Sequence, residues 1–89
     1  MNKTKTATKQ TSYTLIFKPE PEGGYTVIVP SLPGCVTYGT NIDKAKRMAE
    51  DAIKGYIASL KKHGEEIPSD NSLFFSTINI KEKSQISYA

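Results

Sequence analysis

The chain has 89 residues and a formal net charge of +3, with 37% hydrophobic and 24% charged residues. This length supports one domain around one core, and the composition is that of a globular protein rather than a disordered or membrane protein. Three of the 12 basic residues precede Gln10, and the rest of the chain has nine basic and nine acidic residues. A basic nucleic-acid-binding face is therefore not predicted.

The first segment, residues 1–11, is polar and contains the basic residues Lys3, Lys5 and Lys9. It lacks the apolar area that would offset the entropy of ordering, so we predict a disordered basic tail. Neither a signal peptide nor a stretch of about 20 apolar residues is present, which predicts a cytoplasmic protein without membrane contact. Cys35 is the only cysteine, so no intramolecular disulfide is possible. Short domains without one commonly associate, and we expect a homodimer.

Two strands are predicted next, over residues 13–17 and 25–29, because both segments are rich in aromatic and branched side chains. Residues 19–24 separate them with two prolines and two glycines, which is typical of a hairpin loop. The alternation along the two strands places one set of side chains on a common face: Tyr13, Leu15, Phe17, Tyr25, Val27 and Val29.

Pro33 and Gly34 fit the centre of a type II turn, because proline presets φ and glycine accepts the positive φ that follows. A short third strand is predicted after this turn, over residues 35–38, and Gly39 ends it. A three-stranded antiparallel meander results.

A helix is predicted from Thr40, whose hydroxyl would cap it, with Asp43 near the positive end of the helix dipole. It ends near His63, since Gly64 suits the left-handed position that follows a helix. Spacings of three and four residues give an apolar stripe that must cover a sheet. Its members are Ile42, Ala45, Ala49, Ala52, Ile53, Tyr56, Ile57 and Leu60.

Residues 73–80 predict a fourth strand that returns beside the first, parallel to it by a right-handed crossover. The predicted fold class is α+β in the order β-β-β-α-β, with the single helix packed on one face of the sheet. We expect one domain over residues 12–81 and a frayed tail over residues 82–89.

The ordered series of motifs resembles the HicB family of antitoxins. The series begins with Gly24-Tyr25, continues with residues 29–35, Gly39-Thr40 and Ala45, and extends to Tyr56, Leu60 and residues 64–68. The resemblance covers roughly residues 13–80. One departure is Asp43-Lys44 before Ala45, where family members usually have an acidic pair.

The resemblance implies a partial ribonuclease-H-like fold and an antitoxin that neutralises a HicA-like, mRNA-cleaving toxin by direct binding. Many relatives also have a DNA-binding segment after the last strand. This chain ends at Ala89, so DNA binding by this chain alone is not expected. A toxin protein and a second copy of the chain are the expected partners.

Five residues are candidates for contact with a basic toxin surface: Glu20, Glu22, Tyr25, Ser31 and Asp43. For the polar residues, loop solvation and helix capping are simpler interpretations. Half-buried packing explains Tyr25, Tyr38 and Tyr56 about as well as an interface does.

Three other functions remain as alternatives to the antitoxin. The chain could be an orphan homo-oligomeric scaffold or ligand-binding module, or a metal-dependent nuclease that uses Glu50 and Asp51. Cys35 and His63 could form a nucleophile and base, but no orienting group is identified, and a buried hydrophobe and a surface residue are the simpler readings. We therefore predict no catalytic residue, no cofactor and no metal site.

Overall fold

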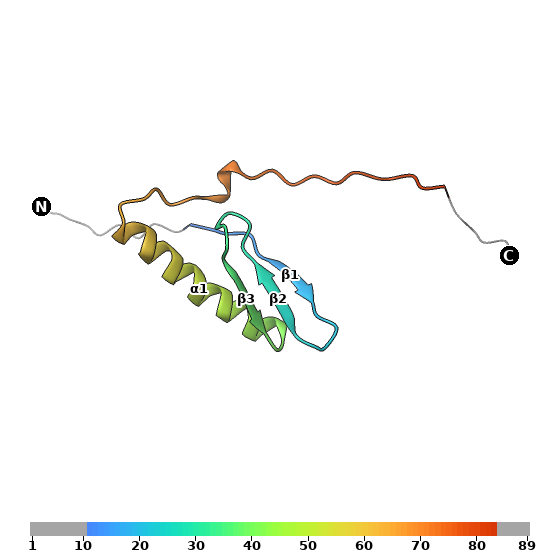
Figure 1. Ribbon diagram of the computed structural model, residues 1–89, viewed down its shortest axis with the longest axis horizontal. Helices are drawn as coiled ribbons and strands as arrows, with labels where there is room; N and C mark the ends of the chain where they lie inside the picture. Colours follow the sequence, from blue (N-terminus) through green and yellow to red (C-terminus); the bar gives the residue numbers. More distant parts are fainter. Residues whose placement is uncertain (1–10, 84–89) are drawn as a thin grey trace, which may run out of the picture.

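The computed structural model describes residues 11–83 of the chain. They form a three-stranded antiparallel sheet followed by one long helix. The strands are β1 (Ile16–Pro19), β2 (Tyr25–Ile28) and β3 (Val36–Gly39), in the spatial order β1-β2-β3. The helix α1 (Ile42–Lys62) crosses one face of the sheet and packs mainly on β2 and β3 (Figure 1).

The predicted meander is confirmed, with small shifts of its boundaries. The first strand begins at Ile16 rather than at residue 13, and it includes Pro19 of the predicted hairpin loop. Pro19 is tolerated because β1 is at the edge of the sheet, where a missing N–H costs no hydrogen bond to a neighbour. In the second turn, Gly34 has φ 82° and Cys35 N–H donates to Leu32 O at 2.9 Å, as the turn prediction required.

The core lies between the sheet and α1. Six of the described apolar residues are buried: Val27, Val29, Leu32, Cys35, Ala45 and Ala49. The predicted inward face is confirmed, since the half-buried side chains of Tyr13, Leu15, Phe17 and Tyr25 pack against these residues. The two alanines are fully buried because a small side chain lets the helix backbone come close to the sheet.

The start of α1 differs from the prediction. The N-cap is Asn41 rather than Thr40, and its Oδ1 accepts a hydrogen bond from Lys44 N–H at 2.8 Å. Asparagine caps a helix at least as well as threonine. At this position the Asn41 carbonyl also accepts a helical hydrogen bond from Ala45 N–H. The helix also buries a narrower stripe than expected, because Ile42 at its first turn remains 44% exposed.

The end of α1 agrees with the prediction. His63 is the C-cap, and Gly64 follows with φ 67°, a conformation that glycine adopts without steric cost. A short 3-10 helix, η1 (Asp70–Ser72), comes next.

The predicted fourth strand is wrong for this chain as the structure describes it. Residues 73–83 form no strand and extend away from the domain in Figure 1. Strand-forming residue types are present, but propensity alone does not make a strand, because the backbone groups also need a partner along their length. The predicted disordered tail, apart from Thr11, and residues 84–89 of the frayed tail lie outside the described residues.

Candidate protein-interaction surface

The signature loop between β2 and β3 is a packed structural element. Leu32 and Val29 are almost fully buried, and Cys35 is 5% exposed among them. Tyr56 of α1 donates its hydroxyl hydrogen to Pro33 O at 2.8 Å, which ties this loop to the helix. The residues that best identify the motif are therefore used for folding.

Asp70 connects three separate segments of the chain. Its Oδ1 accepts a hydrogen bond from Ser31 Oγ at 2.5 Å, and its Oδ2 accepts from Thr14 N at 2.6 Å and from Thr14 Oγ1 at 2.7 Å. The bond from Ser31, followed by those from Thr14, lowers the pKa of the Asp70 carboxyl, because hydrogen bonds favour the charged form. Sequence analysis missed this role, since Asp70 lies in a polar loop with no periodic pattern.

A neighbouring hydrogen bond strengthens the same connection. Tyr13 donates its hydroxyl hydrogen to Pro68 O at 2.6 Å. Burial, followed by the negative charge of Asp70, raises the pKa of Tyr13. The segment before β1 and the segment after α1 are thereby held together.

The face of the sheet opposite α1 has a row of apolar side chains. Ile16 of β1 pairs with Ile28 of β2, and Ile28 pairs with Val36 of β3, so the three side chains are neighbours across the sheet. They are 41%, 37% and 54% exposed, respectively. Tyr38 stands next to this row on β3 and is 47% exposed. We call these four residues the open face.

A groove follows the outer side of β3 and the first half of α1, with a volume of about 530 Å³. Tyr38 belongs both to this β3 groove and to the open face, so the two surfaces are continuous. The remaining lining residues are Gly39, Thr40, Lys44, Arg47, Met48, Glu50, Asp51 and Lys54. The groove therefore presents charges of both signs beside an exposed aromatic ring.

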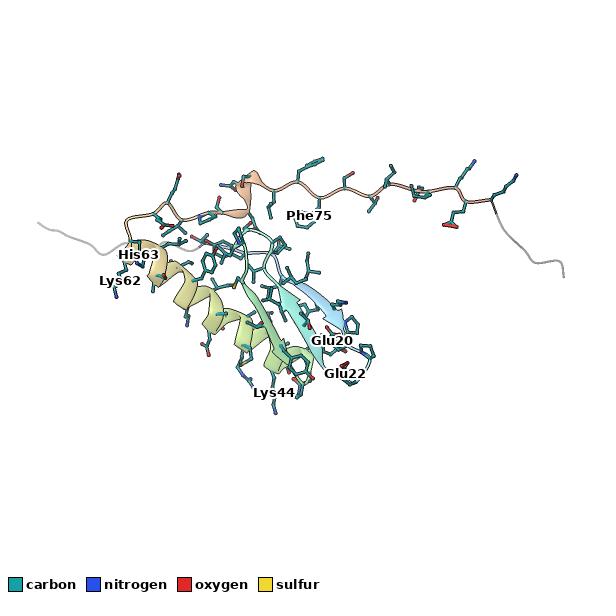
Figure 2. All side chains as sticks on the ribbon, in the orientation of Figure 1. Glu20, Glu22, Lys44, Lys62, His63 and Phe75 are labelled. Carbon is teal, nitrogen blue, oxygen red and sulfur yellow. The ribbon has the colours of Figure 1, made fainter. Side chains whose placement is uncertain are left out.

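The five predicted contact residues do not form one patch. Glu22 is exposed at the hairpin tip, and Asp43 is exposed in the first turn of α1. Glu20 is half-buried and accepts a hydrogen bond from Thr26, beside the open face. Figure 2 shows Glu20 and Glu22 at the same end of the domain as Lys44, and Lys62 and His63 at the opposite end.

The other two predicted contact residues have internal partners. Ser31 is 8% exposed and donates to Asp70. Tyr25 is half-buried and makes an edge-to-face contact with Phe17, with ring centroids 6.5 Å apart.

The sequence contains one signal for the open face. Ile16 and Phe17 are consecutive in a short strand, so apolar side chains lie on both sides of it.

The residues considered for catalysis have ordinary structural environments. Cys35 is buried among apolar side chains, and this burial raises the pKa of its thiol, which disfavours the nucleophilic thiolate. His63 is exposed, and its Nδ1 bonds to Ser59 O at 2.8 Å. Glu50 pairs with Lys54 at 3.3 Å on the surface of α1. Over residues 11–83, no group of three His, Cys, Asp or Glu side chains is arranged to hold a metal ion.

Comparison with known proteins identifies the family. Residues 13–85 match the family model described as a HicB-like antitoxin of a bacterial toxin-antitoxin system. The chain belongs to the HicB-like antitoxin family. This family is generally non-catalytic, and membership implies a toxin partner. Within the part of the chain that the structure describes, no helix is long and apolar enough to cross a membrane.

Individual relatives of this HicB-like chain occur in archaea, cyanobacteria and phage. A UPF0150 protein of Thermoplasma acidophilum is 48% identical over 60 residues, which span 67% of this chain and 87% of that protein. A UPF0150 protein of Synechocystis is 32% identical over 60 residues, which span 67% of this chain and 76% of that protein. An uncharacterized 14.9 kDa protein of Haemophilus phage HP1 is 36% identical over 50 residues, which span 56% of this chain and 38% of that protein.

Proposed function

We propose that this chain neutralises a HicA-like, mRNA-cleaving toxin by direct protein contact through the open face and the β3 groove. The observation that supports this surface is the exposed row of Ile16, Ile28 and Val36 on the side of the sheet that α1 leaves uncovered. Clustered apolar side chains on a surface are typical of protein-binding sites. Occlusion of the toxin by this surface requires no catalytic group in the antitoxin.

Tyr38 is the proposed anchor of the contact. Its ring lies where the apolar row meets the charged groove, and tyrosine is enriched among the residues that contribute most to binding energy. A toxin that binds RNA needs basic surface, and Glu50 and Asp51 in the groove, with Glu22 at the hairpin tip, offer opposite charge. These carboxylates would favour encounter and orientation more than affinity.

The same proposal includes a homodimer in the cytoplasm, where mRNA is cleaved. The support for association is the small core, in which six apolar residues of the described chain are buried while several large apolar side chains remain exposed. Domains of this size gain stability when association covers such surface. Light scattering coupled to size exclusion would give the mass of the free antitoxin directly.

Co-expression with the toxin encoded next to this chain tests neutralisation. The unaltered chain is expected to restore growth and to stop mRNA cleavage, whereas Val36→Glu should lose both effects because it places a charge in the apolar row. Ala58→Glu is the matched control, since Ala58 is exposed on α1 away from both surfaces. Thermal melting of each variant would verify that it folds.

Two results would contradict the proposal. If the unaltered chain leaves toxin activity unchanged, this chain is not the antitoxin of that toxin. If folded Val36→Glu and Tyr38→Ala chains both neutralise as well as the parent, toxin binding does not use the open face.

A further inference from the structure

Residues 73–81, which we call the arm, have the sequence of a strand without the pairing of one. Three of its apolar side chains are largely exposed: Phe74 is 89%, Ile78 is 81% and Ile80 is 70% exposed. Among the described residues, no hydrogen bond between two backbone groups involves residues 74–83. Figure 2 shows Phe75 on the first part of the arm, shortly after η1.

The arm leaves the domain from a fixed point. Asp70, three residues before it begins, is held by the hydrogen bonds from Thr14 and Ser31. Leu73 N–H donates to Asp70 O at 2.9 Å. At about 3.3 Å per residue, nine extended residues reach roughly 30 Å from that point. This distance is longer than a four-residue strand, so the arm can reach a neighbouring molecule and pair with one of its strands.

The outer edge of β1 offers unpaired backbone groups to such a strand. In the hairpin, Glu20 N–H donates to Gly24 O at 3.0 Å, and hydrogen-bonded pairs alternate along an antiparallel ladder. By this alternation the backbone groups of Ile16 and Lys18 point toward β2, and those of Phe17 point away from the sheet. Over residues 11–83, therefore, the Phe17 N–H and C=O have no backbone partner at the sheet edge.

Polarity favours β1 over β3 as the partner of the arm. Beside β1, Leu15 and Phe17 are only half-buried on the helix side of the sheet, because α1 packs mainly on β2 and β3. Beside β3, the groove presents the charged side chains of Lys44, Arg47 and Asp51. An apolar arm would cover Leu15 and Phe17 at β1. At β3 it would instead remove charged side chains from water, which is unfavourable.

We propose that the arm of one molecule adds as a fourth strand to the outer edge of β1 in a second copy. The arm of the second copy pairs in the same way with β1 of the first. This inference rests on the homodimer proposed above and names the segment and the edge that form it. A reciprocal exchange uses one arm and one edge from each copy, so it closes under two-fold symmetry and leaves neither unpaired.

Ile78→Pro tests the exchange in the full chain. Proline removes a backbone donor in the arm, where the described monomer makes no backbone hydrogen bond, so the domain itself should fold normally. The parent chain and the control Ile78→Val should have the mass of a dimer by light scattering, and Ile78→Pro should have that of a monomer.

Amide hydrogen exchange of the antitoxin alone locates the pairing. The Phe17 amide should exchange about tenfold or more slowly in the parent dimer than in Ile78→Pro, because the arm accepts its hydrogen. The Lys18 amide points toward β2 and should be equally protected in both chains. Toxin is absent from this measurement, so a failure of neutralisation does not affect the result.

Three outcomes would overturn the exchange. A parent chain that is monomeric at every concentration removes both the dimer and the exchange. A dimer in which the Phe17 amide is as unprotected as in Ile78→Pro leaves the dimer intact but places its interface elsewhere. Protection of Phe17 that persists after dilution to monomer means that the arm pairs within its own chain.

Discussion

Gly39 at the end of β3 lies so close to α1 that a Cβ atom at this position would be 2.2 Å from the Ala45 backbone nitrogen. The same atom would be 2.8 Å from the Ala45 Cβ. No side chain fits between the strand and the helix here, because the Ala45 nitrogen and Cβ are parts of α1 and cannot move without the helix. Gly39 and Ala45 thus set the distance between the two layers of the domain, and with it the shape of the β3 groove.

Gly39→Ala should therefore destabilise the domain by about 2–3 kcal/mol, since the helix backbone must move to admit the methyl group. Gly55→Ala is the control, because Gly55 is inside α1 and a Cβ there meets nothing within 4 Å. That change should stabilise the chain by about 0.5–1 kcal/mol. Urea unfolding of both variants measures the difference, and equal stabilities would refute the close approach.

Gly24→Ala should cost more stability than Gly23→Ala. Both glycines have positive φ, so alanine is strained at either position by about 1 kcal/mol. Only Gly24 adds a collision, since its Cβ would be 2.1 Å from the Tyr38 hydroxyl oxygen. The same hydroxyl donates to Gly23 O at 2.9 Å.

The measurement that checks this prediction is the difference in melting temperature between the two glycine variants. Displacement of the Tyr38 ring should also weaken toxin binding by Gly24→Ala more than by Gly23→Ala. A Gly23→Ala variant that is the less stable of the two would argue against the packing of Tyr38 over Gly24.

Asn41→Ala should destabilise the chain by about 1 kcal/mol, because it removes the hydrogen bond from Lys44 N–H at the helix start. Thr40→Ala, one residue earlier, should change stability by no more than about 0.5 kcal/mol. Chemical denaturation of the two variants distinguishes the caps. A larger loss of stability in Thr40→Ala than in Asn41→Ala would identify Thr40 as the N-cap.

Asp70 should make the stability of the domain depend on pH in the acid range. Folding lowers the pKa of its carboxyl, so the unfolded chain takes up the proton more readily than the folded chain. Its contribution is complete above the ordinary aspartate pKa of about 4, and it is lost as the pH falls through the lower folded value.

Asp70→Asn should cost about 1–2 kcal/mol at neutral pH, because the charged acceptor of the bonds from Ser31 and Thr14 is lost. It should also flatten the acid side of the pH-stability curve. Glu22→Gln at the exposed hairpin tip is the control, with an expected change within about 0.5 kcal/mol. An unaltered acid slope in Asp70→Asn would show that other carboxyls dominate.

The local sequence determined most elements of this domain. Alternation in residues 13–17 and 25–29 identified the inward face, and the 3.6-residue periodicity after Asn41 identified the helix. Pro33 with Gly34, and Gly64 after the helix, fixed a turn and an end through backbone preferences that act within a few residues. Such features depend on neighbours along the chain, so one sequence suffices to predict them.

The tertiary structure decided which residues meet across the sequence. Asp70 lies 39 residues from Ser31 and 56 from Thr14, and nothing in its local pattern indicates those bonds. Likewise, Ser31 and Tyr25 have inward partners that separate them from Glu22 and Asp43. The conformation of the arm is decided in the same way. Residues 73–80 have the composition of a strand, but strand formation requires pairing with a sheet edge, and in the described chain they do not pair with β1.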